Sequence, residues 1–255
     1  MAKPKTGIYG LTGCAGDQLA ILNCEDQLLD VLSLIDVRDF LTGASRNDES
    51  CDLDLALVEG AVLSQRDEAR LLAIRKRSRL LVALGTCAMH GGVAALDAEA
   101  DRTRMLHEVY GDAGRQYDGT LGRALHEVVK VDAAIPGCPI EKGQFLAAVA
   151  GLLNGDAPVL ADNPVCGECR IRENNCLLIE KGIICCGPLT EAGCDARCPA
   201  VGVPCLGCRG PVVEANVASA EALFLAKGFA PEEVARKLRT FVPARALKAA
   251  AGGAA

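Results

Sequence analysis

The chain has 255 residues, half of them hydrophobic and 24% charged, which is the balance of a soluble folded protein with one or two domains. Its 33 acidic and 27 basic residues give a formal net charge of −6. This charge argues against nucleic-acid binding, because that function needs a basic face. Cysteine is unusually common, with 14 copies, and nine of them lie between Cys166 and Cys208.

The first ten residues carry basic side chains without an apolar segment behind them, so we expect no signal peptide. The longest apolar stretch, residues 145–153, is too short to span a bilayer. We therefore expect no membrane segment and a cytoplasmic location, where reductants keep thiols from forming disulfides. Metal or cluster binding explains so many cysteines better.

Short apolar runs alternate with longer amphipathic segments over residues 1–155. Ser64 and Asp67 have the spacing of a capping box at the start of one helix. The strands predicted from this pattern cover residues 7–11, 37–41, 53–58, 80–84 and 128–131. The predicted helices cover residues 17–35, 64–77 and 141–153, with one or two polar helices within 97–126. Such alternation predicts an α/β fold with a parallel sheet and helices on both faces.

The alternation ends at residues 154–158, where we place the boundary between a domain of residues 1–155 and one of residues 156–255. Residues 165–211 have no usable hydrophobic period, so we expect that a bound group must organise them. The segments predicted after them are helices at 219–228 and 231–241 and a disordered Ala/Gly tail at 249–255.

Three isolated cysteines each follow a predicted strand of the first domain. Cys14 follows the first strand, Cys87 follows strand 80–84, and Cys138 follows strand 128–131. In an open parallel sheet, ligands bind beyond the carboxyl ends of the strands, where such loops converge. We therefore expect these three thiols to meet around one metal centre.

A four-iron cluster takes four protein ligands, so a fourth donor is needed beside these three cysteines. Asp17 completes a Cys-x-x-Asp with Cys14, whereas Cys24 lies about 10 Å further along the predicted helix. That distance favours Asp17 as the ligand. The alternative is that Asp17 only caps the helix, a position that suits aspartate well.

Eight cysteines of the second domain form two consecutive groups of four. They are Cys166, Cys169, Cys176 and Cys185 in one group, and Cys194, Cys198, Cys205 and Cys208 in the other. This number fits two four-iron clusters, and the Cys198-Pro199 pair favours clusters over the alternative of two structural zinc sites. Cys186 could replace its neighbour Cys185 as a ligand.

The remaining features have simpler interpretations. Cys24 and Cys51 are expected to be small buried hydrophobic residues. The basic run at 75–79 lies at the end of a predicted helix, where solvated cations complement the helix dipole. Among the three histidines, His90 alone is close enough to Cys87 to affect a metal site.

Five motifs, in this order, resemble the small subunit of [NiFe] hydrogenases, in particular the delta subunit of cytoplasmic, sulfhydrogenase-type, NAD(P)-linked enzymes. They are Leu-Thr-Gly-Cys14-Ala-Gly-Asp17-Gln, Val-Glu59-Gly, Gly-Thr-Cys87-Ala, Pro-Gly-Cys138-Pro and the cysteine block 166–211. The resemblance implies a flavodoxin-like domain that carries a proximal cluster, and a small irregular or helical C-terminal domain that carries a medial and a distal cluster.

The resemblance also implies which residues hold three [4Fe–4S] clusters. The proximal group would be Cys14, Asp17, Cys87 and Cys138, the distal group Cys166, Cys169, Cys176 and Cys185, and the medial group Cys194, Cys198, Cys205 and Cys208. Many small subunits have cysteine in place of Asp17, and membrane-bound relatives have histidine in place of Cys166. The fourth medial position is often proline, where this chain offers a cysteine.

The implied function is electron transfer between a [NiFe] large subunit and a flavin-containing NAD(P) reductase subunit, with a further iron–sulfur subunit as a possible partner. Glu59 would lie near the large subunit as an interface hydrogen-bond acceptor, or else in a proton path. A related family, the small quinone-reductase subunit of respiratory NADH dehydrogenase, shares the first domain. The alternatives are therefore an iron–sulfur subunit of a quinone- or disulfide-reducing complex, a free-standing ferredoxin-like carrier, or a zinc-stabilised binding module.

Overall fold

The computed structural model describes residues 3–96, 101–117 and 119–247. Its centre is a five-stranded sheet in the order β2-β1-β3-β4-β5, with every neighbouring pair parallel. The strands are β1 (Lys5–Gly10), β2 (Asp36–Asp39), β3 (Leu53–Glu59), β4 (Ser78–Leu84) and β5 (Ala133–Ile135). This is the strand order of flavodoxin-like folds, which confirms the predicted fold class.

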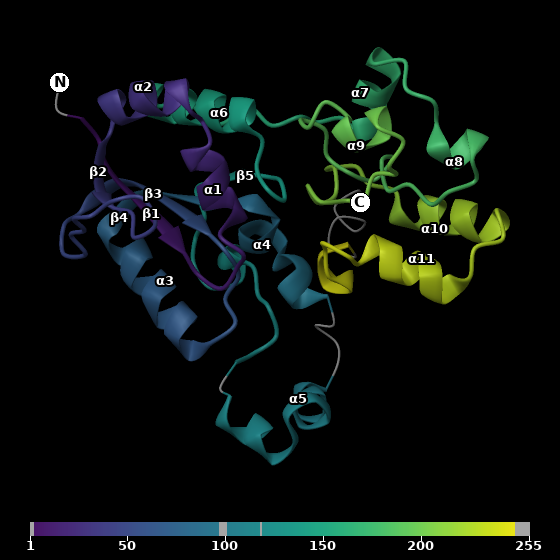
Figure 1. The fold of residues 1–255 in the computed structure, drawn as a ribbon, viewed down its shortest axis with the longest axis horizontal. Coiled ribbons are helices and arrows are strands. Elements are labelled where there is room, and N and C mark those ends of the chain that lie inside the picture. Colours follow the sequence, from purple (N-terminus) through teal and green to yellow (C-terminus); the bar gives the residue numbers. More distant parts are fainter. Residues whose placement is uncertain (1–2, 97–100, 118, 248–255) are drawn as a thin grey trace.

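Helices cover both faces of this sheet (Figure 1). Side chains alternate along β3, so that Leu55 and Leu57 face one core and Ala56 and Val58 face the other. The helices of the first face are α1 (Gly16–Leu22), α2 (Asp26–Leu34) and α6 (Lys142–Asn154), and the second face carries α3 (Gln65–Arg77) and α4 (Gly85–His90). The predicted capping box at the start of α3 is confirmed.

Two of the predicted elements are wrong in detail. The single helix expected at 17–35 is two helices, because Glu25 has a positive φ of 49° that interrupts the helical backbone between α1 and α2. The last strand lies at 133–135 and not at 128–131. The amides of Val128 and Val129 donate to the Leu125 carbonyl in a turn, so pairing with β4 begins only after that turn.

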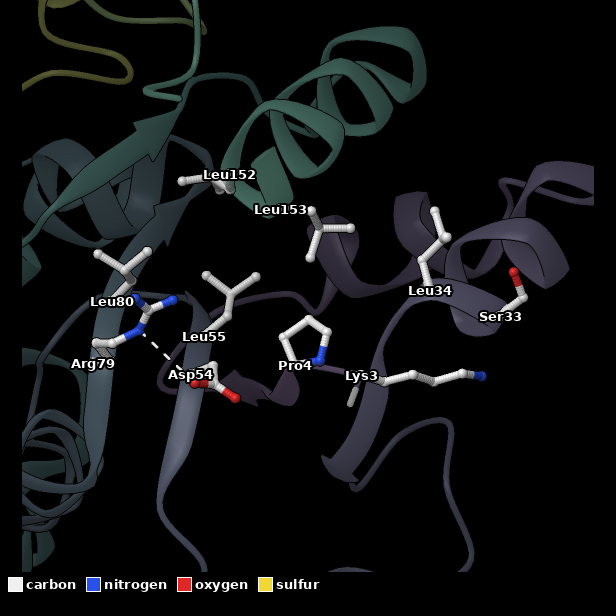
Figure 2. Close-up of a pocket in the computed structure, with 10 residues that line it drawn as sticks. All are labelled: Lys3, Pro4, Ser33, Leu34, Asp54, Leu55, Arg79, Leu80, Leu152 and Leu153. Atoms are coloured by element: carbon white, nitrogen blue, oxygen red, sulfur yellow. Dashed lines mark ion pairs between the residues drawn. The ribbon is translucent and has the colours of Figure 1, made fainter. Parts of the chain in front are cut away.

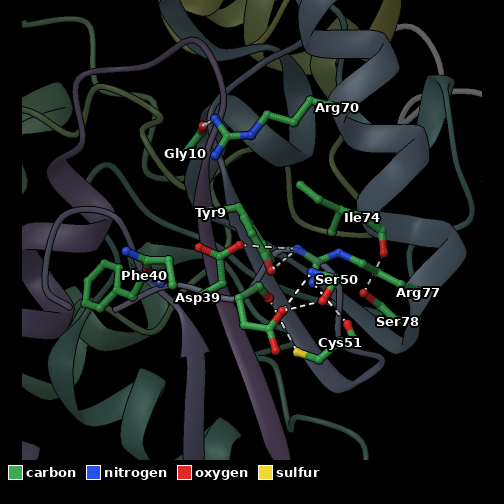
Figure 3. Close-up of polar contacts among 12 residues, drawn as sticks. Tyr9, Gly10, Asp39, Phe40, Ser50, Cys51, Arg70, Ile74, Arg77 and Ser78 are labelled. Atoms are coloured by element: carbon green, nitrogen blue, oxygen red, sulfur yellow. Dashed lines mark hydrogen bonds and ion pairs between the residues drawn. The ribbon is translucent and has the colours of Figure 1, made fainter. Parts of the chain in front are cut away.

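The basic run at the end of α3 is less solvated than expected (Figure 3). The Arg77 guanidinium donates to the Tyr9 hydroxyl at 2.6 Å and to the buried Asp39 carboxylate at 3.2 Å. Arg75 pairs with Asp132 at 2.5 Å. The interpretation as a solvated helix end is therefore wrong for these two arginines, whose long side chains reach back to buried acceptors.

Residues 85–127 contain several short helices. They are α4, the 3₁₀ helix η1 (Gly92–Ala95), α5 (Arg102–Tyr110) and the 3₁₀ helices η2 (Gly111–Gln116) and η3 (Leu125–Glu127). The segment with α5 extends away from the sheet (Figure 1). It fulfils the expectation of one or two polar helices, although residues 97–100 and 118 lie outside the described part.

The second half of the chain packs on a core of its own, on the opposite side of the molecule from α2 (Figure 1). Its helices are α7 (Val165–Ile171), α8 (Leu177–Glu180), α9 (Arg197–Ala200), α10 (Val217–Ala226) and α11 (Pro231–Leu238). The predicted helical pair is α10 and α11. Phe224 and Val234 of this pair pack with Leu178 and Leu189 of the cysteine-rich segment.

Although they have no regular spacing, apolar residues of this segment therefore bury their side chains against α10 and α11. The expectation that a bound group organises residues 165–211 stays a prediction. The domain boundary near residue 155 stays a prediction, and the tail at 249–255 lies outside the described residues. No helix among the described residues has the length and apolar character that a membrane crossing requires.

Candidate metal centres

The four side chains of the predicted proximal group line one small cavity of about 70 Å³. Cys14 follows β1, Cys87 lies in α4 directly after β4, and Cys138 follows β5. The carboxyl ends of three parallel strands thus bring these thiols together, at the edge of the sheet where the sequence placed them. Asp17 reaches the same cavity from the first turn of α1.

A larger cavity of about 530 Å³ lies at the opposite edge of the sheet (Figure 2). Asp54 and Leu55 line it near the start of β3, and Arg79 and Leu80 line it near the start of β4. No cysteine lies among its lining residues in the described part of the chain. The three cysteines of the proximal group therefore lie at the carboxyl edge, away from this cavity.

Glycines bring the backbone close to the proximal thiols. A Cβ atom built on Gly92 would lie 2.6 Å from the Cys87 sulfur, and its φ of +57° disfavours any other residue. A Cβ atom built on Gly16 would lie 3.1 Å from the Cys14 sulfur. These positions keep side chains away from the sulfur atoms.

The proximal thiols lie among other negative groups. Burial, together with the negative charges of Asp17 and Cys14, raises the pKa of Cys87 to about 11. Burial also raises the pKa of Cys138, at the mouth of the cavity, to about 11, with the strongest neighbouring effect from Cys87. Thiolates gathered in this way need a compensating positive charge, which bound metal supplies. The donor set therefore fits a metal centre.

The buried Asp17 carboxylate does not cap its own helix. Its Oδ1 accepts a hydrogen bond of 2.8 Å from the backbone N–H of Ile140, beyond Cys138, and α1 has no cap hydrogen bond from the side chain at its start. Burial raises the pKa of Asp17 to about 6, against the effect of the Ile140 hydrogen bond. The cap alternative therefore has no hydrogen bond to support it, and the carboxylate stays available to the cavity.

Glu59 caps α1 instead. Its Oε2 accepts from the backbone N–H groups of Asp17 at 3.0 Å and Gln18 at 3.2 Å. Its Oε1 accepts from the Gln18 side-chain amide at 2.6 Å, while Thr42 donates to the other end of that amide. Only 3% of Glu59 is exposed, so this carboxylate is fully used inside the chain, which leaves little of it for the interface role expected from the sequence.

The predicted distal group also comes together. Burial, followed by the charges of Cys185, Cys169 and Cys176 in that order, raises the pKa of Cys166 to about 11. A Cβ atom built on Gly187 would lie 3.3 Å from the Cys166 sulfur and 3.6 Å from the Cys185 sulfur. α7 carries the first two of these cysteines, and Cys176 precedes α8.

The medial group is only partly assembled. Burial, together with the charges of Cys194, Cys138 and Cys198, raises the pKa of Cys208 to about 11. Cys205 is buried, and the charges that act on it are those of Cys185 and Cys186. Three predicted medial ligands thus lie together next to the proximal group.

Cys205 links the medial and distal groups. Its backbone N–H donates to the Cys185 sulfur at 3.3 Å, and its own sulfur lies 3.5 Å from the Thr190 hydroxyl. Cys186, in contrast, is buried in the apolar core of the second half with its sulfur 3.9 Å from the Lys237 carbonyl. Its side chain is therefore poorly placed to replace Cys185.

Cys24 lies in a hydrophobic core and Cys51 packs partly against another, as expected. In the described residues, no three or more Cys, His, Asp or Glu side chains converge as ligands of a single metal ion. Sequence reasoning missed the cap by Glu59 and two further buried residues, Thr86 and Arg209. Their partners lie 17 to 122 residues away, and no local pattern signals such contacts.

A family model agrees with the geometry of the first half. The model described as "NADH ubiquinone oxidoreductase, 20 Kd subunit" matches residues 14–152, more than half of the chain. The chain belongs to this family. The matched part of this family member begins at Cys14 and includes all four residues of the proximal group.

Relatives that match most of the chain are parts of hydrogenases. Sulfhydrogenase 2 subunit delta of Pyrococcus furiosus is 39% identical over 237 residues, 93% of this chain and 98% of that protein. One component of the F420-non-reducing hydrogenase of Methanocaldococcus jannaschii is 32% identical over 234 residues, 81% of each. A chain in the crystal structure of an NAD+-reducing [NiFe]-hydrogenase matches with a TM-score of 0.55 and 26% identity, over 62% of this family member and 95% of that chain. The resemblance stated from the motifs is confirmed.

Proposed function

We propose that this chain is the electron-transfer small subunit of a [NiFe] hydrogenase and holds three [4Fe–4S] clusters. The observation that carries this proposal is the contiguity of the three cysteine groups. Cys208 of the medial group lies within electrostatic reach of Cys138, and Cys205 contacts Cys185 of the distal group. Contiguous cluster sites are what electron transfer through one chain requires.

Twelve side chains would serve as cluster ligands. They are Cys14, Asp17, Cys87 and Cys138 at the proximal site, Cys194, Cys198, Cys205 and Cys208 at the medial site, and Cys166, Cys169, Cys176 and Cys185 at the distal site. A bound cluster supplies a centre that takes up and releases one electron at a time. The chain supplies buried thiols, nearby backbone N–H groups and glycines that keep side chains away from the sulfur atoms.

The partners follow from which groups reach the surface. Cys14 and Cys138 are exposed at the proximal end, where a [NiFe] large subunit would cover them. Cys176 is exposed at the distal end, where a flavin-containing NAD(P) reductase subunit, or a further iron–sulfur subunit, would dock. The similarity to an NAD+-reducing enzyme supports a flavin-containing NAD(P) reductase subunit as the electron acceptor, although F420-non-reducing relatives are similar too.

A quinone-reducing complex is the competing assignment, because the family model carries that name. That model covers residues 14–152 only, whereas hydrogenase components match most of the chain and therefore include the distal and medial groups. The second half of the chain thus favours a hydrogenase.

The test uses the complex purified with its large subunit. Hydrogen should bleach the cluster absorbance of the wild-type complex. The Cys208→Ser variant should contain less iron, and hydrogen should bleach only the absorbance of its proximal cluster. Cys51→Ser is the matched control, because Cys51 lies outside all three groups. A complex whose absorbance does not respond to hydrogen, or a Cys208→Ser variant equal to the control, would refute the proposal.

A further inference from the structure

A buried arginine joins the loops of the proximal and medial groups. Arg209 follows Cys208 directly, and only 1% of it is exposed. Its Nε donates to the carbonyls of Glu191 at 3.1 Å and Ala192 at 3.0 Å, just before Cys194. Its Nη1 donates to the Pro136 carbonyl at 3.0 Å, just before Cys138, and its Nη2 donates to the Gln144 side chain at 2.8 Å. One guanidinium therefore holds two cysteine loops that come from different halves of the chain.

Thr86 occupies the same junction from the side of the sheet. It precedes Cys87, and its backbone N–H donates to the Gly137 carbonyl at 2.8 Å, just before Cys138. Its hydroxyl lies 3.0 Å from that carbonyl and also contacts the carbonyl of Cys208. This single buried threonine, the neighbour of Cys87, thus contacts Cys208 itself and Gly137, the neighbour of Cys138.

The backbone around this junction is closely packed. A Cβ atom built on Gly210 would overlap the imidazole of the partly buried His90, in α4. A Cβ atom built on Gly193 would lie 2.5 Å from Nη2 of Arg209. Segment 208–210 is therefore held on both sides, by the proximal loops and by the loop before Cys194.

The charge of Arg209 has no carboxylate bonded to it. Its four hydrogen-bond acceptors are neutral carbonyl and amide oxygens, and the described residues include no ion pair with it. A buried cation of this kind is costly unless negative charge lies close by. Burial raises the pKa of Cys194 and of Cys208, and the Arg209 charge acts in the opposite direction on both. The negative charge near this guanidinium is thus that of the medial thiolates and of the buried Glu191 carboxylate, whose pKa the Arg209 charge lowers against the effect of burial.

We propose that Arg209 and Thr86 are positioning residues that lock Cys208 against the loops of Cys87 and Cys138, and that the Arg209 charge raises the midpoint potential at the medial site. The sign follows from electrostatics, because reduction adds negative charge beside a fixed cation. The inference rests on the proposed function, since it assumes a cluster at the medial group.

The experiment compares variants in the complete hydrogenase complex, after iron analysis, by EPR-monitored redox titration. Arg209→Gln should lower the midpoint potential of one cluster. In Arg209→Lys, which keeps the charge, that midpoint potential should stay closer to the wild-type value. Thr86→Val should weaken the magnetic interaction between proximal and medial signals, and Thr86→Ser should restore it. Arg245→Gln is the matched control, because Arg245 also joins the two halves, through the Gly122 carbonyl at 2.7 Å and Glu127, away from the cysteines.

Unchanged potentials in an iron-replete Arg209→Gln complex would overturn the electrostatic role. An unchanged magnetic interaction in Thr86→Val would overturn the positioning role. If Arg209→Gln loses iron, Arg209→Lys decides on the lock, because lysine keeps the charge but cannot make all four hydrogen bonds. An altered magnetic interaction at full iron supports the lock, and a wild-type magnetic interaction refutes it. A wild-type complex without cluster signals would instead refute the proposed function, so the two failures are distinguishable.

Discussion

Replacing Glu59 by alanine should open the start of α1, because this carboxylate is the acceptor for its first amides. The substitution leaves the backbone N–H groups of Asp17 and Gln18 buried without their present acceptor. Each unsatisfied buried donor costs about 1–3 kcal/mol, so the local opening free energy of α1 should fall by about 2–6 kcal/mol. Glu59→Gln keeps one acceptor oxygen but replaces the other by an NH₂ group, and it should therefore lose less than Glu59→Ala.

Hydrogen exchange measured by mass spectrometry on the purified complex reads this local stability directly. Peptides that cover α1 should exchange faster in Glu59→Ala, in intermediate fashion in Glu59→Gln, and as in wild type in Glu221→Ala, which changes an exposed residue of α10. Protection of α1 in Glu59→Ala equal to that in the Glu221→Ala control would refute the assignment of Glu59 as the cap.

Three further outcomes are expected. Asp17→Cys should retain the proximal cluster with a changed potential and EPR signal, since a thiolate replaces a harder oxygen donor; an unchanged titration would show that Asp17 is no ligand. Burial raises the pKa of Glu191 from 4.5 to about 7, so its contribution to stability is present at low pH and is lost as pH rises through that range. The melting temperature of the wild-type complex should therefore fall relative to Glu191→Gln between pH 5 and pH 8, and parallel curves would contradict this. Gly210→Ala should lower the melting temperature more than Gly228→Ala, because both have positive φ but only the first would strike His90; equal losses would show that the collision is relieved.

Much of the first half was predictable because its signals are local. The five strands were found in number and, for four of them, in place, since buried parallel strands are short apolar runs. Strand 128–131 was misplaced because its valines are apolar and β-branched, yet their amides close a turn on Leu125. The break at Glu25 was missed because the apolar period continues across it.

In the candidate site, too, some features were predictable from the sequence and others were not. The convergence of Cys14, Cys87 and Cys138 follows from parallel topology alone, since each follows a strand. Parallel topology does not predict the cap by Glu59 or the contacts of Thr86 and Arg209, because these depend on how distant loops meet. The position of Cys205 between the medial and distal groups could not be predicted from the spacing of the cysteines either, because that spacing groups Cys205 with Cys208.

The most direct test of the central claim is the iron, acid-labile sulfide and zinc content of the anaerobically purified full chain in its complex. Three [4Fe–4S] clusters predict about twelve iron and about twelve sulfide for each copy of this chain, after subtracting the metal of its partners. About eight of each would leave the Asp17 site without a cluster. Zinc without sulfide would contradict the account and make the cysteines structural.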